Sequence, residues 1–243
     1  MKFIHVISGS DSSGGAGMQQ DVRTVHGFGF HAVCSVTGIT VQSFQKAVSV
    51  FPVPDDVFRQ QLKVSEMFNP AAVKIGALFS VRQLYDVIDF IRDCPVPVII
   101  DPVFRPTAGN SFYSPEMISL FRREVLPHAD VITPNKTELE ILFEKQFSSI
   151  EEAAEYVLKN KPQLTSFILK GGHFEGTEIK EAAVDGSIHY FFKPRRNFQY
   201  SHGTGCMLST AIACGLADGM LLTDAFCQAT EMVSREYLKA DFQ

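Results

Sequence analysis

The turn at residues 202–206, His-Gly-Thr-Gly-Cys, is the part of the chain whose residue types and spacing best suit chemistry. It leads into residues 207–215, a run of small and apolar residues that predicts a helix. The first turn of a helix has unpaired backbone N–H groups and the positive end of the macrodipole, and glycines let such a backbone approach an anion closely. The pattern therefore predicts a phosphate-binding turn beside a thiol, whereas the simpler alternative is an ordinary loop-to-helix junction.

Cys206 in this turn is the candidate reactive group. A helix N-terminus is expected to lower the pKa of a thiol toward neutrality, which would make a thiolate available as a base or a nucleophile. Hydrolysis by a nucleophilic cysteine would need a histidine base, and His202 and His173 are the candidates. The other cysteines, whose spacing predicts neither a disulfide framework nor a zinc site, are interpreted as small core residues. They are Cys34, Cys94, Cys214 and Cys227.

Further glycines and polar residues follow directly after the predicted strands. They are Gly9 and Asp11, then Asp101, then Asn135 and Glu138, and finally Lys170, Gly171 and Gly172. Ligands of open α/β sheets bind beyond the carboxyl ends of the strands, so these residues are expected to meet at one edge. Glycine turns, carboxylates, a lysine and a thiol suit phosphoryl transfer, which needs donors around the phosphates, Mg²⁺ and a group near the attacking hydroxyl.

The elements that must position these residues alternate between strands and helices. Strands are expected at residues 3–8, 30–36, 72–75, 96–100, 131–132 and 166–169, followed by an antiparallel hairpin of 181–184 and 188–192. Helices are expected at residues 17–27, 54–68, 80–94, 115–126, 138–143, 149–160, 205–217 and 223–238. The alternation predicts an α/β fold with a mostly parallel sheet, and residues 1–243 are expected to form a single domain.

Composition narrows the classes of partner. The net charge of −5 disfavours a nucleic-acid-binding protein, which usually has a basic face. The basic cluster at residues 193–196, Lys-Pro-Arg-Arg, is interpreted as a solvated loop. No segment reaches the ~18 apolar residues of a membrane span, and the apolar run at residues 3–7 is interpreted as a buried strand rather than a signal peptide. We therefore expect a cytoplasmic protein that binds neither nucleic acid nor membranes.

Taken together, the motifs resemble those of the hydroxymethylpyrimidine and phosphomethylpyrimidine kinases of thiamine biosynthesis, which are ribokinase-like. The matching segments follow the family order over nearly the whole chain and are residues 8–21, 40–42, 74–76, 101–103, 133–138, 170–173 and 202–206. The resemblance implies a three-layer αβα sandwich with a mostly parallel central sheet. It also implies a homodimer that uses ATP and Mg²⁺ to phosphorylate 4-amino-5-hydroxymethyl-2-methylpyrimidine and then its monophosphate.

The resemblance further implies a role for each matched position. The aminopyrimidine is expected to be held by Gly9, Asp21, Gln42 and Val103, ATP by Asn135, Lys170, Gly171 and Thr204, and Mg²⁺ by Asp101 and Glu138. Gly203 and Gly205 are expected to form the anion hole, and Cys206 is expected to accept or orient the proton of the substrate hydroxyl. Without the resemblance, Asp21 would be interpreted as a solvated helix residue, Gln42 as a strand-end hydrogen bonder and Glu138 as a first-turn helix acid.

The chain departs from the family pattern at residues 104–109, where Arg105 either contacts a phosphate or lies in solvent. Pyridoxal kinases, a related branch, have a further cysteine in this lid segment, and its absence from residues 101–109 favours the pyrimidine branch. Leu78 takes a position that is often Met beside the pyrimidine. A pyridoxal kinase and a non-catalytic pyrimidine or nucleotide sensor remain the alternatives. Residues 28–30, Phe-Gly-Phe, are a candidate dimer contact.

Overall fold

The computed structural model describes residues 1–43, 46–104, 112–174, 177–195 and 202–240. Within these ranges a nine-stranded sheet has the strand order β3-β2-β1-β4-β5-β6-β7-β8-β9. The strands are β1 (Phe3–Asp11), β2 (His31–Gln42), β3 (Ala47–Pro52), β4 (Ala72–Ile75), β5 (Val98–Ile100), β6 (Val131–Ile132), β7 (Ser166–Leu169), β8 (Glu178–Val184) and β9 (Ile188–Pro194). From β2 to β7 in this order the strands are parallel, whereas β3, β8 and β9 pair antiparallel with their neighbours.

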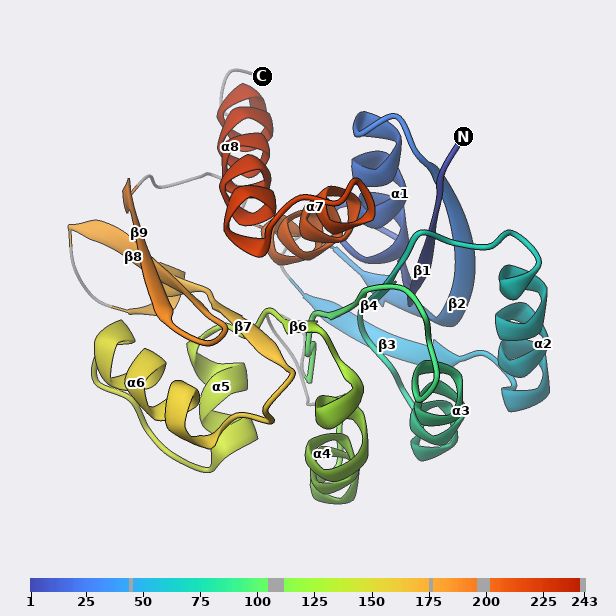
Figure 1. Ribbon diagram of the computed structural model, residues 1–243. Coiled ribbons are helices and arrows are strands. Elements are labelled where there is room, and N and C mark those ends of the chain that lie inside the picture. The colour runs from blue at the N-terminus through green and yellow to red at the C-terminus, as the bar shows by residue number, and fades with distance from the viewer. Residues whose placement is uncertain (44–45, 105–111, 175–176, 196–201, 241–243) are drawn as a thin grey trace.

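Helices cover both faces of the sheet (Figure 1). One face carries α1 (Gly17–Gly27), α7 (Thr204–Ala217) and α8 (Leu222–Ala240). The other carries α2 (Asp55–Glu66), α3 (Val81–Ile91), α4 (Pro115–Leu120), α5 (Lys136–Phe143) and α6 (Ile150–Asn160). Short π- and 3-10 segments, η1 (Phe121–Val125), η2 (Leu126–His128) and η3 (Gly171–His173), complete the fold. The predicted αβα layers and mostly parallel sheet are confirmed.

Buried strand residues alternate between two hydrophobic cores, as expected for a sheet covered on both faces. In β4, Ala72 belongs to the core under α1, α7 and α8, whereas Val73 and Ile75 belong to the core under α2 to α6. Lys74 lies between them in this alternation and is fully buried. A lysine at such a position is rare unless its charge is paired.

Three predicted boundaries were wrong for identifiable reasons. Strand β2 continues beyond Val36 to Gln42, because β3 pairs with its second half, and β3 itself was not predicted. Helix α5 begins at Lys136 rather than Glu138, because Asn135 caps it. The predicted helix at residues 115–126 changes into the π-helical η1 after Leu120.

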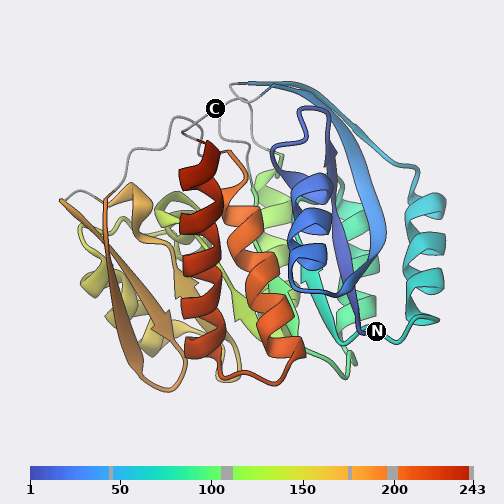
Figure 2. The same ribbon diagram turned by 90° about the horizontal axis from the view of Figure 1, so that it is seen from above.

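The carboxyl ends of the parallel strands and the start of α7 lie along one edge of the sheet, the upper edge in Figure 2. Residues that directly follow the parallel strands therefore face one region. Among the described helices, none combines the length and the apolar character needed to cross a membrane.

Candidate active site

A cavity of about 1120 Å³ opens at this edge of the sheet. The predicted site residues that line it are Gly9, Gln42, Asp101, Val103, Asn135, Glu138, Lys170, Gly203, Thr204, Gly205 and Cys206. Asp21 and Gly171 do not line it. Gly171 is packed so closely against β8 that a Cβ there would lie 1.9 Å from the carbonyl oxygen of Lys180. The structure therefore brings together most, but not all, of the residues that the sequence singled out.

Lys170 connects two carboxylates from neighbouring strand ends. Its Nζ lies 2.9 Å from Oδ1 of Asp101, which follows β5, and 3.5 Å from Oε2 of Glu138 in α5, which follows β6. Burial alone would lower the pKa of Lys170, but the two carboxylates outweigh burial and raise it. Burial raises the pKa of Glu138 to about 7, against the opposing effect of Lys170. The cluster is thus a compact charged centre with little access to water.

Glu138 and Asn135 also hold each other through a capping box at the start of α5. The side-chain oxygen of Asn135 accepts a hydrogen bond from the Glu138 N–H at 3.0 Å, and the Asn135 N–H donates to the Glu138 carboxylate at 2.7 Å. Such a cap satisfies two helix-end donors and fixes both side chains. The same contacts that stabilise the helix therefore orient two candidate ligands toward the cavity.

The start of α7 faces this charged centre. Gly203 is the N-cap with φ 89°, and a Cβ there would lie 1.9 Å from the carbonyl oxygen of Gly15, so the position requires glycine. A Cβ on Gly205 would lie 3.4 Å from Nζ of Lys170 and 3.6 Å from Oδ2 of Asp101. An anion bound at the helix start would therefore meet backbone N–H groups and the Lys170 ammonium together.

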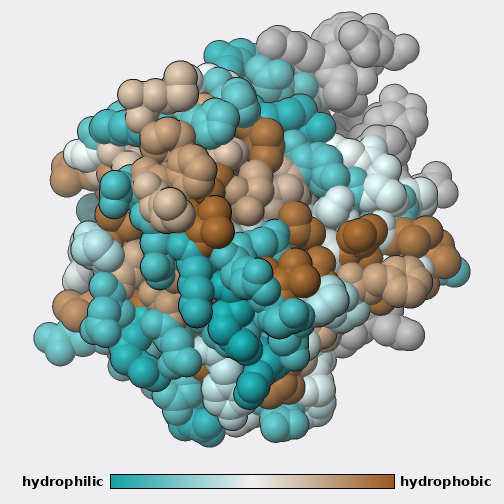
Figure 3. Space-filling view, turned by 90° about the vertical axis from the view of Figure 1, so that its right-hand side faces the viewer, coloured by the Kyte–Doolittle hydropathy of each residue, from teal (hydrophilic) through white to brown (hydrophobic). Residues whose placement is uncertain are grey.

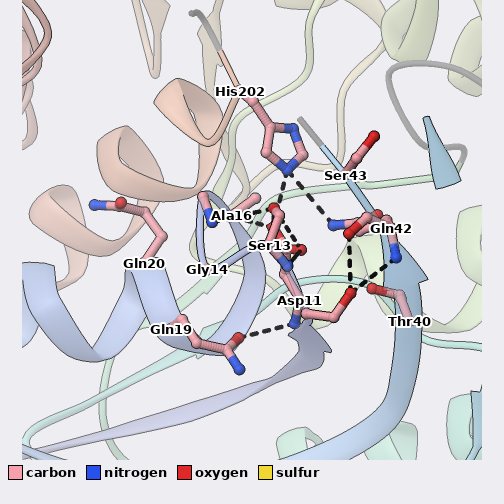
Figure 4. A network of polar contacts seen from close by, with 12 residues as sticks. Asp11, Ser13, Gly14, Ala16, Gln19, Gln20, Thr40, Gln42, Ser43 and His202 are labelled. Atoms are coloured by element: carbon pink, nitrogen blue, oxygen red, sulfur yellow. Dashed lines mark hydrogen bonds and ion pairs between the residues drawn. The ribbon is translucent and has the colours of Figure 1, made fainter. Parts of the chain in front are cut away.

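A polar network ties Gln42 and the end of β1 to the turn before α7 (Figure 4). The Asp11 carboxylate accepts hydrogen bonds from the N–H groups of Ser13 and Ala16, each at 2.8 Å, and lies 2.9 Å from Nε2 of His202. The Gln42 amide lies 3.5 Å from the same His202 nitrogen. Burial alone would raise the pKa of Asp11, but hydrogen bonds from Gln42, Ser13 and His202 lower it. The network places Gln42 beside the anion-binding turn.

Asp21 lies beneath the cavity rather than in its wall. Its carboxylate is fully buried and accepts hydrogen bonds from Lys74, Ser8 and Thr210. A direct contact between Asp21 and a ligand would require one of these partners to give way. That contact stays a prediction.

The expected low pKa of the Cys206 thiol was wrong. Burial raises the pKa of Cys206 to about 12, although Lys74 and the backbone N–H of Gly17 act in the opposite direction. Desolvation outweighs the helix start because Cys206 is only partly exposed, in the lining of the cavity. In the absence of ligands the group is therefore a protonated thiol at neutral pH.

Several other expectations from the sequence need correction. Lys193 lies in β9 rather than in a solvated loop, and its half-buried side chain pairs with the buried Glu181, at 2.8 Å from Nζ to Oε2, in the cavity lining. The hairpin register could have shown this, because Glu181 pairs with Phe191, two residues from Lys193 on the same face. Leu78 is a fully buried core residue that does not line the cavity.

The remaining expectations concern the other cysteines and Arg105. Cys34 and Cys227 are exposed rather than in the core, whereas Cys214 is buried as predicted. Arg105 and most of the segment that follows it lie outside the described residues.

Solved structures with the same fold identify the class of protein to which this chain belongs. The pyridoxal kinase of Bacillus subtilis in an ADP complex superimposes with a TM-score of 0.86 at 28% identity, over 95% of this chain and 90% of that one. A phosphomethylpyrimidine kinase of Clostridium difficile 630 superimposes with a TM-score of 0.83 at 26% identity, over 97% and 99% of the two chains. The fold and the site thus define a ribokinase-like small-molecule kinase.

Comparison of the sequence with known proteins identifies the family within this class. The hydroxymethylpyrimidine/phosphomethylpyrimidine kinase of Aquifex aeolicus is 36% identical over 215 residues, which are 85% of this chain and 82% of that protein. Residues 11–242 match the Phosphomethylpyrimidine kinase family. The chain belongs to the phosphomethylpyrimidine kinase family, as its motifs predict.

The raised thiol pKa predicts how Cys206 reacts with iodoacetamide. Only the thiolate reacts, so Cys206 should be alkylated more slowly than the exposed Cys227 at neutral pH. Its rate should rise by about tenfold per pH unit up to about pH 9, because the thiolate fraction grows in this proportion below the pKa. Mass spectrometry of the separate peptides measures both rates. A Cys206 rate that levels off near neutral pH would contradict the assignment.

Proposed function

We propose that this chain transfers the γ-phosphoryl group of ATP to 4-amino-5-hydroxymethyl-2-methylpyrimidine and then to the resulting monophosphate. The observation that carries the proposal is the shared cavity, because its lining brings Lys170 and the start of α7, which can bind an anion, together with Gly9, Gln42 and Val103. The sequence relatives named as kinases of this pyrimidine support the choice of substrate. We also propose that residues 1–243 act as one kinase domain in the cytoplasm, where ATP is the phosphoryl donor.

The residues suggest how the transfer proceeds. The hydroxymethyl oxygen attacks the γ-phosphorus in line, and the bond to the β–γ bridging oxygen breaks to release ADP. Backbone N–H groups at Gly203 to Gly205 and the Lys170 ammonium offset the charge of the transferring group. Cys206 orients the substrate hydroxyl, and its thiolate takes the proton when that form is present.

Asp101 and Glu138 fit a metal that arrives with the nucleotide better than a permanent metal site. Among the described residues, no group of three or more His, Cys, Asp or Glu side chains converges to hold an ion. Mg²⁺ commonly takes one or two carboxylates, substrate phosphates and water, and these two carboxylates at the phosphate end match that donor set. When bound, Mg²⁺ would neutralise phosphate charge.

A second candidate is a pyridoxal kinase, because a pyridoxal kinase structure superimposes on this chain with a TM-score of 0.86. Both substrates are flat heteroaromatic rings with a hydroxymethyl group. The match of residues 11–242 to the Phosphomethylpyrimidine kinase family, together with a sequence relative named as a kinase of the pyrimidine, favours the pyrimidine.

Parallel assays of ADP release with the two substrates test the proposal. With Mg²⁺-ATP we expect turnover of the hydroxymethylpyrimidine and product masses of the monophosphate followed by the pyrophosphate. Turnover of pyridoxal alone would move the assignment to vitamin B6 chemistry, and binding without ADP release would indicate a sensor.

The kinetics of Cys206→Ala test the role of the thiol. This variant should reduce kcat by about 10²-fold or more if the thiol takes the proton. Near-normal turnover of this variant would exclude that role.

We further propose a homodimer formed through the β2–β3 hairpin. Residues 28–30 are not favoured, because Phe28 and Phe30 are half-buried and pack on the core beside α1. The hairpin instead exposes four large apolar side chains at the edge of the sheet, Ile39, Val41, Val48 and Phe51. Figure 3 looks onto this side, where a band of hydrophobic residues crosses the surface. Exposed edge strands with apolar faces favour association.

Light scattering of Phe51→Asp tests this surface. We expect the wild-type protein to have twice the mass of one chain and Phe51→Asp to have the mass of one, because a carboxylate cannot be buried unpaired in an apolar interface. Leu164→Asp is the matched control, since Leu164 is an exposed apolar residue outside the hairpin. A dimer that survives Phe51→Asp would exclude the hairpin as its interface.

A further inference from the structure

The loop between β4 and α3 presents an aromatic side chain to the cavity. Phe79 is half-buried and lines the cavity, as do Ala77, two residues before it, and Phe112. Leu78 between them belongs to the core under α2 to α6 and is fully buried. The side chain of this loop that can contact a ring in the cavity is therefore the one at position 79 rather than the one at position 78.

Polar contacts fix the backbone of this loop. The buried side chain of Gln83 accepts a hydrogen bond from the Phe79 N–H at 2.9 Å and donates one to the Thr37 carbonyl in β2 at 2.6 Å. The Thr37 hydroxyl donates to the Ala77 carbonyl at 2.8 Å. These three bonds tie the loop to β2 and to the first turn of α3, so Phe79 is held in place before a ligand arrives.

The Phe79 ring packs on two glycines and on a second aromatic ring. A Cβ on Gly9 in β1 would lie 2.8 Å from Cε2 and Cζ of Phe79, and a Cβ on Gly38 in β2 would lie 2.6 Å from Cδ2. Both glycines therefore leave space that the ring fills. Phe112 meets the ring edge to face, with the centroids 5.0 Å apart and the planes at 89°. The ring is thus enclosed by β1, β2 and Phe112, and its remaining surface faces the cavity.

This part of the lining suits a flat ring rather than a phosphate group. The side chains of Ala77, Phe79, Phe112 and Val103 are apolar and line the same cavity. They have no hydrogen-bond donor for a phosphate oxygen, whereas aromatic side chains contact flat rings favourably through their faces and edges. Gly9, which is expected to hold the aminopyrimidine, lies directly against the Phe79 ring.

We propose that Phe79 is a specificity-determining residue for the transfer. Its ring is the apolar wall against which the flat ring of the substrate packs, and its bulk limits the substituents that this ring can carry. Pyridoxal has one substituent more than the hydroxymethylpyrimidine on a ring of the same size, so a fixed wall at this place favours the pyrimidine. The inference rests on the proposed kinase function and names the side chain that selects its ring.

Matched leucine variants test the contact with the ring. Phe79→Leu keeps an apolar side chain and removes the aromatic face. Phe143→Leu is the control, because Phe143 is also half-buried and meets Tyr156 edge to face at 5.7 Å, outside the cavity lining. In calorimetric titrations Phe79→Leu should raise the dissociation constant of the pyrimidine by about three- to tenfold, with the dissociation constant of ADP unchanged. Equal pyrimidine constants in the two variants would overturn the contact.

The variant Phe79→Ala tests the limit on substituents. Loss of the wall leaves room for the additional group of pyridoxal. We expect the ratio of kcat/KM for pyridoxal to kcat/KM for the pyrimidine to rise by about tenfold or more over the wild-type ratio. The KM of the pyrimidine should rise as well, because the variant loses a binding contact. An unchanged ratio would overturn the role of Phe79 in specificity.

The outcomes remain distinct from failure of the proposed function. A wild-type protein that binds the pyrimidine but phosphorylates neither substrate would overturn the proposed function, and the titrations, which need no turnover, would still decide the contact with Phe79. Wild-type turnover of the pyrimidine, with no change of its dissociation constant in Phe79→Leu, would overturn the inference alone. If Phe79→Ala does not fold, the ratio of the dissociation constants of pyridoxal and the pyrimidine in Phe79→Leu decides the limit on substituents.

Discussion

The ammonium group of Lys170 is the contact on which the site depends. Three strands that are neighbours in the sheet, β5, β6 and β7, lead to Asp101, to Glu138 and to Lys170. Parallel pairing brings these ends together, and without a cation between them the two buried carboxylates would repel each other. Because a Cβ on Gly205 would lie within 4 Å of this centre, the start of α7 faces the sheet edge, and we propose that the two bind phosphate together.

Two further sets of contacts hold α7 against the rest of the molecule. Above the sheet edge, Asp11 and His202 connect the end of β1 to the turn before α7, next to Gln42. Beneath it, Asp21 binds α7 through Thr210 and pairs with Lys74. Helix α7 is thus fixed from both sides, by contacts that span 191 residues of the chain at His202 and 189 residues at Thr210. Phosphoryl transfer depends on such positioning more than on covalent chemistry by the protein.

Periodicity and motif order were sufficient to predict the layers, the parallel sheet and most members of the cavity lining. They could not predict β3, because its residues are partly buried or exposed and show no alternating burial pattern. Burial explains the other differences between the predicted site and the observed one. Asp21 is a typical solvated helix residue by type, and only the tertiary structure places Lys74 and Thr210 around it. The Cys206 pKa was misjudged for the same reason, because local sequence indicates the helix start but not the desolvation.

The steady-state kinetics of Lys170→Met test the central claim most directly, which is that this ammonium organises the transfer site. We predict that kcat/KM for ATP falls by about 10²- to 10³-fold, that Lys170→Arg recovers part of it, and that the dissociation constant of the pyrimidine does not change. Lys145→Met is the control, since Lys145 pairs with Glu152 away from the cavity. A Lys170→Met enzyme with wild-type kcat/KM for ATP would contradict the account.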